Sequence, residues 1–411
     1  MADIRPFCCV RPAAEVADRV AALPYDVYNR QEAKEEVQRE PLSFLKIDRA
    51  ETSFDDSVDT YAPEVYAKAK ELLENDIEKG VYVTDPDRVY YIYQLVMDGR
   101  SQTGLVACSS VDDYLNNTIK KHENTRADKE VDRITHVDTC SAQTGPIFLA
   151  YRADKVISGV VAKYLKTEPV YDFTAVDGVC HRVWKISQAD DVEKIYLAFQ
   201  QIDKIYIADG HHRAASAVKV GLKRREENPG YTGEEEFNYF LSVLFPHDEL
   251  MIMDYNRTVK DLNGLGLDEF IEKVKEKFEI ENSDLPVSPD KKGTFGMYTD
   301  GRWYKLTAKP ELFEGKDAVG SLDVSVLQDN LLGPVLGIGD PRTDSRIDFV
   351  GGIRGLKELE KRADGDMCIS FSMYPTSITE LFEVADNGLL MPPKSTWFEP
   401  KLRSGLFIHK I

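Results

Sequence analysis

The sequence has few of the features that mark secreted or membrane proteins. Its six cysteines are scattered along 411 residues without a Cys-x-x-Cys pair. A chain of this length needs no disulfide framework, so we expect reduced thiols. No stretch approaches the ~18 apolar residues of a membrane-spanning helix, and the first residues lack the charged-then-apolar pattern of a secretory signal. These absences predict a cytoplasmic protein without a membrane partner.

Basic charge is also scarce. Lysine and arginine number 52 against 71 acidic residues, which gives a formal net charge of -19. Such a chain repels polyanions unless a local basic patch overrides the general field. The richest basic stretch, Lys219 to Arg225, is followed at once by glutamates and is typical of a solvated helix end. We therefore exclude DNA and RNA as the principal partner and rank phosphodiester hydrolysis last among the functions considered.

Two common ligand-binding patterns are missing. Neither the P-loop Gly-x-x-x-x-Gly-Lys-Ser/Thr nor the dinucleotide-binding pattern Gly-x-Gly-x-x-Gly occurs. Any nucleotide must therefore be bound by a less common phosphate-binding motif. The seven histidines and six cysteines show no zinc spacing. The adjacent His211 and His212 cannot easily aim at one metal ion. The motifs thus exclude the usual nucleotide folds and predict no zinc site.

What remains is the composition of a globular α/β chain. Apolar residues make up 42% and charged residues 30%, which excludes a disordered chain. Short apolar runs alternate with helical stretches between residues 146 and 260, and a second set follows, so we predict a mixed α/β fold with some antiparallel pairs. We expect an N-terminal and catalytic core in residues 1–260. A second α/β unit is expected in residues 261–411, with its tail returning to the site.

Several elements can be placed with their boundaries. Apolar residues at helical spacing predict a helix over residues 58–80 that ends at a glycine. Two β-branched and aromatic runs, 89–96 and 102–108, flank the Asp98-Gly99 turn signal and predict a hairpin. A strand over 204–208 and a helix over 211–226 follow, and helices over 266–278 and 321–332 are expected in the second unit.

The densest polar cluster follows the predicted strand that ends at Asp209 and Gly210. His211, His212 and Arg213 then fall in the first turn of a helix, where backbone N–H groups and the helix dipole favour an anion such as phosphate. Arg213 and the two imidazoles add donors, and Asp209 could hold Mg²⁺ or orient a hydroxyl. The alternative is an aspartate cap followed by solvent-facing histidines. Four polar groups at one strand end favour the anion site.

A second cluster runs from Lys120 to Arg126 and continues to Arg133 and Gln143. It combines a possible base, Glu123, with groups that could pair with phosphate, namely His122, Thr125 and Arg133. Gln143 is placed on the substrate side. Taken alone, such a charged run is more typical of a solvated face. It supports a binding site only if it lies close to Asp209 in the fold.

Two further segments are candidates for the same site. In the run Pro392-Pro-Lys-Ser-Thr, Lys394 offers a point charge for a phosphate, while Ser395 and Thr396 offer hydroxyls. An ordinary turn before a last strand is the alternative. Asp26, in Pro24-Tyr-Asp-Val, could approach the substrate or close a turn.

The run Asp209-Gly-His-His-Arg-Ala-Ala resembles the phosphate-binding signature of the ParB/sulfiredoxin superfamily, in particular the Asp-Gly-His motif of free-serine kinases. A wider set of motifs, spanning nearly the whole chain, resembles the family known as domain of unknown function 1015: Ile4-Arg-Pro-Phe, Pro24-Tyr-Asp-Val, His122-Glu-Asn-Thr, Met391-Pro-Pro-Lys-Ser-Thr and Pro400-Lys-Leu-Arg-Ser-Gly-Leu. The chain departs from that family at Asn124, where arginine is expected, and before Arg257, where histidine is expected.

The resemblance implies a ParB/sulfiredoxin-like nucleotide-binding core in which Asp209 to Arg213 cradle the phosphates of ATP or ADP with Mg²⁺. Glu123 is then the candidate base. The leading hypothesis is a kinase that transfers a phosphoryl group to the hydroxyl of a small metabolite, and the resemblance alone names free L-serine, with O-phosphoserine as product. The alternative is a non-catalytic nucleotide-binding regulatory protein. The sequence does not decide between ATP and ADP, nor does it determine the oligomeric state.

Overall fold

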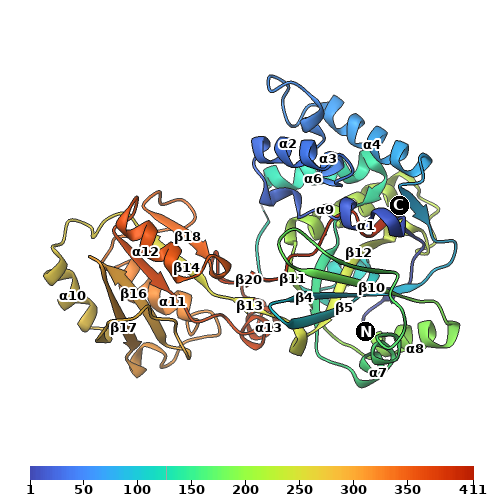
Figure 1. The fold of residues 1–411 in the computed structure, drawn as a ribbon. Coiled ribbons are helices and arrows are strands. Elements are labelled where there is room, and N and C mark those ends of the chain that lie inside the picture. Colours follow the sequence, from blue (N-terminus) through green and yellow to red (C-terminus); the bar gives the residue numbers. More distant parts are fainter. Residues whose placement is uncertain (126) are drawn as a thin grey trace. The chain divides into compact units, whose positions relative to one another are not determined.

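The structure, a computed structural model, describes residues 1–125 and 127–411. Arg126, the end of the second predicted cluster, lies outside the described residues. The chain divides into two compact units: unit 1 comprises residues 1–250 and 400–411, and unit 2 comprises residues 251–399. Each unit has its own sheets, helices and apolar core, so the predicted mixed α/β fold is confirmed (Figure 1). Both chain ends belong to unit 1.

Unit 1 is built on a mixed sheet that contains nine of the described strands. In spatial order these are β6 (Ile119–Lys120), β11 (Ile205–Asp209), β8 (Ile147–Tyr151), β12 (Tyr239–Pro246), β5 (Arg100–Ser110), β4 (Tyr90–Met97), β10 (Cys180–Ile186) and β9 (Tyr171–Thr174), with β1 (Ile4–Arg5) paired to β5. The pairs β11–β6 and β12–β8 are parallel, and the other pairs are antiparallel. The parallel pair β11–β6 is the most important for the candidate site described below, because that site lies at the carboxyl ends of these two strands.

A second sheet of unit 1 joins distant parts of the sequence. Its order is β3 (Tyr82–Thr84), β2 (Cys9–Pro12), β21 (Ile408–Lys410) and β7 (Ala142–Gln143). The last strand of the chain therefore lies between the second strand and the seventh. This pairing holds residues 400–411 in unit 1.

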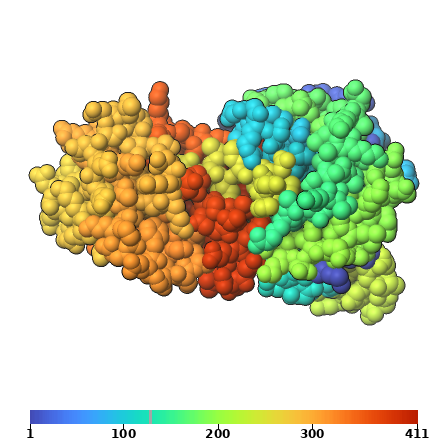
Figure 2. Space-filling view, turned by 90° about the horizontal axis from the view of Figure 1, so that it is seen from below, coloured from blue at the N-terminus to red at the C-terminus, as the bar shows by residue number. Residues whose placement is uncertain are grey.

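The helices of unit 1 cover both sides of the large sheet (Figure 1). One side carries α7 (Lys155–Tyr164) and α8 (Ala189–Phe199), and Figure 2, seen from that side, shows these green segments at the surface. The other side carries α4 (Pro63–Glu78), α6 (Ala127–Cys140) and α9 (His211–Glu227). The unit also contains α1 (Ala17–Val20), α2 (Arg30–Arg39), α3 (Leu45–Asp48) and α5 (Val111–Leu115). The large core includes the small residues Ala214 and Ala217, which let α9 pack closely.

Local chemistry explains where the predicted elements begin and end. Asp98 and Gly99 have φ of 52° and 77°, the left-handed pair of residues that a two-residue hairpin between β4 and β5 requires. Pro63 occupies the first turn of α4, where its missing N–H costs no helical hydrogen bond. Asp154 caps α7 by accepting hydrogen bonds from the N–H groups of Val156 and Ile157 at 2.8 and 3.0 Å. The predicted hairpin is therefore confirmed, and the helix expected over 58–80 is found, with narrower bounds.

Unit 2 has its own sheet of six described strands. Their order is β15 (Phe278–Ser283), β17 (Arg302–Ala308), β16 (Thr294–Thr299), β19 (Ile369–Ser372), β14 (Tyr255–Val259) and β18 (Ile347–Gly351), and a short pair joins β13 (Ile252–Met253) to β20 (Trp397–Phe398). The helices are α10 (Leu267–Lys275), α11 (Asp323–Leu327), α12 (Leu356–Asp364) and α13 (Ile378–Asp386). The helix expected over 321–332 is α-helical only to Leu327 and continues as a π-helical turn over Gln328–Leu332. No helix in the described parts of either unit is long and apolar enough to cross a membrane.

Candidate functional site

The site forms where two parallel strands end. In the β6–β11 pair Ile119 lies opposite Ile205, and Lys120 opposite Tyr206. Because parallel strands run in the same direction, the segments that leave their carboxyl ends emerge at the same edge of the sheet. The segment after β6 carries His122 and Glu123, and β11 leads into His211. The structure therefore brings the first two predicted clusters together.

The turn from β11 into α9 depends on Gly210. This residue has φ 92° and ψ 33°, a left-handed conformation that residues with a side chain rarely adopt, and it precedes the first residue of α9. Its N–H donates to Asp209 Oδ1 at 2.8 Å. A helix N-terminus of this kind presents unpaired N–H groups and the positive end of the helix dipole, both of which favour an anion.

Two cations flank the carboxylate of Asp209. Lys401 Nζ lies 3.4 Å from Asp209 Oδ2, and an Arg213 guanidinium nitrogen lies 3.9 Å from the same oxygen. Burial by itself disfavours a charged carboxylate, but Lys401 and Arg213 outweigh it and hold the pKa of Asp209 below its usual range. Asp209 is thus an ionised acceptor between two positive charges. Its side chain keeps 38% of its surface exposed, so it remains accessible to a ligand.

Lys401 lies beside Asp209 in the candidate site, and the sequence analysis did not predict this position. It lies in the run Pro400-Lys-Leu-Arg-Ser-Gly-Leu, which supported the family resemblance, but nothing in that run assigns it to the site. Its position beside Asp209 follows from the pairing of β21 with β2 and β7, which brings the end of the chain back to unit 1.

Arg213 is held from the side opposite to Asp209. One terminal nitrogen donates to the carbonyl of Pro146 at 2.7 Å. The same segment approaches so closely that a Cβ on Gly145 would lie 3.3 Å from Ser404 Oγ and 3.7 Å from Arg213. These contacts orient the guanidinium along the turn, where it can face an anion bound at the start of α9.

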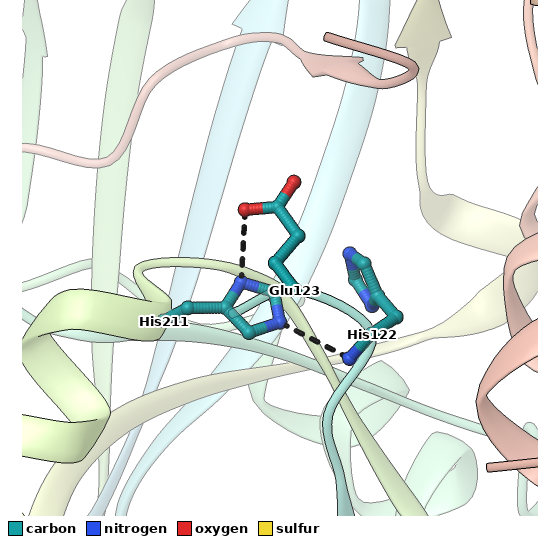
Figure 3. A group of neighbouring side chains, drawn as sticks. All are labelled: His122, Glu123 and His211. Carbon is teal, nitrogen blue, oxygen red and sulfur yellow. Dashed lines mark hydrogen bonds and ion pairs between the residues drawn. The ribbon is translucent and has the colours of Figure 1, made fainter. Parts of the chain in front are cut away.

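His211 connects the two strand ends (Figure 3). Its Nδ1 lies 3.6 Å from Glu123 Oε2, and the backbone N–H of His122 points to its Nε2 at 3.5 Å. The rings of His122 and His211 meet edge to face with centroids 4.4 Å apart. Burial lowers the pKa of His211 to about 4 and that of His122 well below its usual value, so both imidazoles are neutral at pH 7.

His122 is the most unusual residue of this group. It is fully buried, and neither of its ring nitrogens has a hydrogen-bond partner among the residues that the structure describes. Nitrogen and oxygen donors of His122, Glu123 and His211 all lie within 4.8 Å of one another, a grouping that could hold a metal ion. The histidine spacing in the sequence did not predict this group, because His122 and His211 are 89 residues apart and the β6–β11 pairing brings them together.

Thr125 and His212 both act on the carboxyl group of Glu130. Thr125 donates its hydroxyl to Glu130, which also pairs with Lys219 of α9. Burial opposes the ionised form of Glu130, but Lys219, Thr125 and, to a smaller extent, His212 lower the pKa of this carboxyl. Thr125 therefore bonds within the protein.

Arg133 and Asp26 line a cavity of about 260 Å³ in unit 1. Arg133 lies with its guanidinium carbon 4.0 Å from the centre of the Tyr25 ring and donates to Asp132 at 2.9 Å. The walls offer charges of both signs, since Asp48, Glu51 and Arg49 also line them. A smaller cavity of about 30 Å³ touches both Arg133 and Arg213. The two cavities therefore share Arg133 as a lining residue, and the smaller one reaches Arg213.

Gln143 is bonded to the sheet at both ends of its amide. Its nitrogen donates to the carbonyl of Tyr239 at 3.1 Å, and its oxygen accepts from the N–H of Leu241 at 2.6 Å. These bonds tie β7 to β12. The side chain also lines the small cavity beside Arg213.

Lys394, Ser395 and Thr396 belong to unit 2, whereas the other predicted site residues belong to unit 1. Lys394 has φ 56°, is exposed, and holds its ammonium group 5.5 Å from the centre of the Tyr255 ring. Ser395 donates its hydroxyl to the carbonyl of Pro392. The shared site of Lys394 and Asp209 stays a prediction.

The fold and the site together define a mixed α/β protein with an anion-suited turn at the end of a parallel strand pair. The chain belongs to the family described as protein of unknown function (DUF1015), whose model matches residues 4–325. This match confirms the family resemblance inferred from the sequence motifs. No curated protein matches the chain.

The solved structures that match the chain include the following three, each with a TM-score below 0.5. A free serine kinase in complex with AMP is 15% identical, with 73% of this chain and 91% of that chain covered and a TM-score of 0.33. A conserved hypothetical protein from Pyrococcus furiosus is 15% identical, with 74% and 94% covered and a TM-score of 0.33. C-terminally truncated SbnI from Staphylococcus aureus is 11% identical, with 72% and 85% covered and a TM-score of 0.36.

Proposed function

We propose that the protein is a small-molecule kinase that transfers a phosphoryl group from ATP or ADP to the hydroxyl of a small metabolite, with free L-serine as the best named acceptor. The observation that carries the proposal is the ionised Asp209 at the N-terminus of α9, flanked by Lys401 at 3.4 Å and Arg213 at 3.9 Å. Phosphoryl transfer is catalysed mainly by positioning and charge neutralisation, which this arrangement is suited to supply.

Each part of the site has a role in this proposal. The N–H groups of α9, Arg213 and Lys401 would hold the phosphate oxygens, and His212 would add a donor. Mg²⁺ that accompanies a nucleotide would supply charge neutralisation, and Asp209 offers it a carboxylate oxygen. Glu123, with 46% of its side chain exposed, is the candidate base for the acceptor hydroxyl.

The acceptor would occupy the cavity of about 260 Å³ beside Arg133. An amino acid carries an ammonium group and a carboxylate, and the cavity walls offer acidic side chains for the first and arginines for the second. The volume suits a small metabolite rather than a polymer. The choice of serine itself rests on the resemblance of Asp209-Gly-His-His-Arg to the free-serine kinase motif.

The test is a reaction of the full-length protein with L-serine, Mg²⁺ and either ATP or ADP, with O-phosphoserine measured by mass spectrometry. We expect product in the unaltered protein and a loss of about a hundredfold or more in Asp209→Asn, because that change removes the negative charge at the reacting centre. The control is Asp190→Asn, which alters an exposed aspartate of α8 in the same unit.

An Asp209 variant that retained full activity would overturn the assignment. Nucleotide binding without turnover of serine or of other hydroxyl metabolites would favour the regulatory alternative. A thermal shift would detect that outcome, since a ligand that binds the native state raises its melting temperature.

A further inference from the structure

We infer that His122, Glu123 and His211 form a binding site for a divalent transition-metal ion of the zinc type. The inference goes beyond the kinase proposal, because it requires neither a nucleotide nor an acceptor. The three side chains come from the ends of the parallel strands β6 and β11, and their donor atoms lie within 4.8 Å of one another.

The geometry suits such an ion. A metal bound at about 2.0–2.2 Å by imidazole nitrogens and a carboxylate oxygen separates those donors by a little over 3 Å. His211 Nδ1 and Glu123 Oε2 are 3.6 Å apart, so this pair needs only a small movement to close on an ion (Figure 3). Coordination through Nδ1 places the ring proton on Nε2, so the 3.5 Å contact between that nitrogen and the His122 N–H would have to open. Three protein ligands would leave further coordination positions for water or a phosphate oxygen, as in catalytic metal sites.

The unpartnered ring of His122 is an independent observation that points to a ligand. Burying a polar group without a hydrogen bond is destabilising, so buried imidazoles are normally bonded. His122 is 0% exposed and has a partner for neither ring nitrogen among the described residues. A metal ion bound through one nitrogen would give a partner to one of the two ring nitrogens that lack one among the described residues.

The donor set selects the class of metal. Mg²⁺ prefers oxygen ligands, whereas two imidazoles and one carboxylate suit Zn²⁺, Fe²⁺, Co²⁺ and related ions.

The test uses the full-length protein, stripped of metal with a chelator and titrated with Co²⁺ in the absence of nucleotide. We expect one equivalent to bind with ligand-field absorption in the visible range, to be displaced by Zn²⁺, and to be retained in an excess of Mg²⁺. Because loss of even an outer-shell partner weakens metal binding about 10–100-fold, we expect Glu123→Gln to weaken it about a hundredfold.

Glu123 is suited to this test because its side chain is 46% exposed, so its replacement leaves the core intact. His122→Asn, checked for folding by circular dichroism, should abolish the absorption. The control His247→Gln changes a histidine whose Nδ1 accepts from the N–H of Ala153, away from the cluster, and should bind Co²⁺ normally.

The proposal is overturned if the unaltered protein binds no stoichiometric Co²⁺, or if Glu123→Gln binds it as tightly as His247→Gln does. In the second case the ion would be held by cysteines or other adventitious groups. Displacement by Mg²⁺ at similar concentration would also overturn the assigned metal class. None of these outcomes depends on kinase activity, so the two proposals can fail separately.

Discussion

Lys401 changes the charge balance of the site more than any residue that the sequence motifs indicated. It lies 3.4 Å from Asp209 Oδ2, closer than Arg213 at 3.9 Å, and it is only partly exposed. A cation in this position can neutralise phosphate oxygens while it keeps Asp209 ionised. An ammonium on a flexible stem can also shift between the carboxylate and a bound anion, which the more constrained guanidinium of Arg213 cannot do as easily.

We therefore expect Lys401→Met to reduce kcat/KM for phosphoryl transfer by about tenfold to a hundredfold, the usual cost of one well-placed charge. Lys401→Arg should restore part of the loss, because it returns the charge with a different shape. Steady-state kinetics with O-phosphoserine as readout would measure both. The matched control is Lys223→Met, which removes an ion pair with Asp138 elsewhere in unit 1. Equal activities of the Lys401 and Lys223 variants would remove Lys401 from the mechanism.

At the scale of residues, local chemistry predicted part of the site and could not predict the rest. Asp209, Gly210 and Arg213 follow directly from a strand that ends in polar residues before a small-residue helix. The sequence left open whether Glu123 and His211 meet, and it gave no sign that the buried His122 lacks a hydrogen-bond partner among the described residues. These features depend on which strands pair, and strand pairing is decided by contacts between residues far apart in the sequence.

At the scale of elements, the strand–turn–helix unit of β11, Gly210 and α9 holds the site. A Cβ at Gly210 would lie 3.0 Å from Arg213 Nε, and the backbone there is left-handed at φ 92°. An alanine must either strain the turn or displace the guanidinium. Left-handed backbone costs residues with a side chain about 1–2 kcal/mol, apart from any displaced contact.

We expect Gly210→Ala to lower the free energy of unfolding by about 1–2 kcal/mol and to impair binding of nucleotide. Gly159→Ala is the matched control, because Gly159 lies inside α7 with an open position for the new methyl group and should gain about 0.5–1 kcal/mol. Urea unfolding would measure the first effect, and equilibrium binding of ADP the second. A Gly210→Ala protein as stable as the unaltered one would show that the turn tolerates a side chain.

Long, periodic elements were predictable from the sequence, and short ones were not. The α9 helix was expected over 211–226 and is found over His211–Glu227, because Ala, Val and Leu recur at helical spacing and Gly210 sets its start. The two-residue strands β6 and β7 show no periodicity of their own. They are extended because neighbouring strands supply hydrogen-bond partners, which is a tertiary effect.

At the scale of the molecule, the chain leaves unit 1 after residue 250 and returns at residue 400. The two ends of the intervening unit are close, since the N–H of Glu399 donates to the carbonyl of Met251 at 3.4 Å and β13 pairs with β20. The returning segment then supplies Lys401 to Asp209, and β21 to the middle of the four-stranded sheet. Unit 1 is therefore a discontinuous domain that is complete only with the last twelve residues.

This connection predicts opposite results for two deletions. Removing residues 400–411 should leave unit 1 unable to fold, because it exposes the cavity that Leu406, Phe407 and Ile408 fill, all of them 0% exposed. At about 1.5–3 kcal/mol for each buried side chain, the loss approaches the whole net stability of about 5–15 kcal/mol for a domain. Replacing residues 251–399 by a short Gly-Ser linker should instead leave unit 1 folded, since the two ends that it joins are close.

Circular dichroism and thermal unfolding would distinguish the two proteins, and Co²⁺ absorption would report on the strand ends around His122. A folded protein lacking residues 400–411 would mean that β2 and β7 can form the sheet without β21. Lys401 would then contribute charge to the site without being needed for the fold of unit 1. An unfolded linker protein would mean that unit 1 depends on unit 2 for stability. The predicted combination, one deletion tolerated and the other not, would show that the distant tail completes both the fold of unit 1 and the charge of its site.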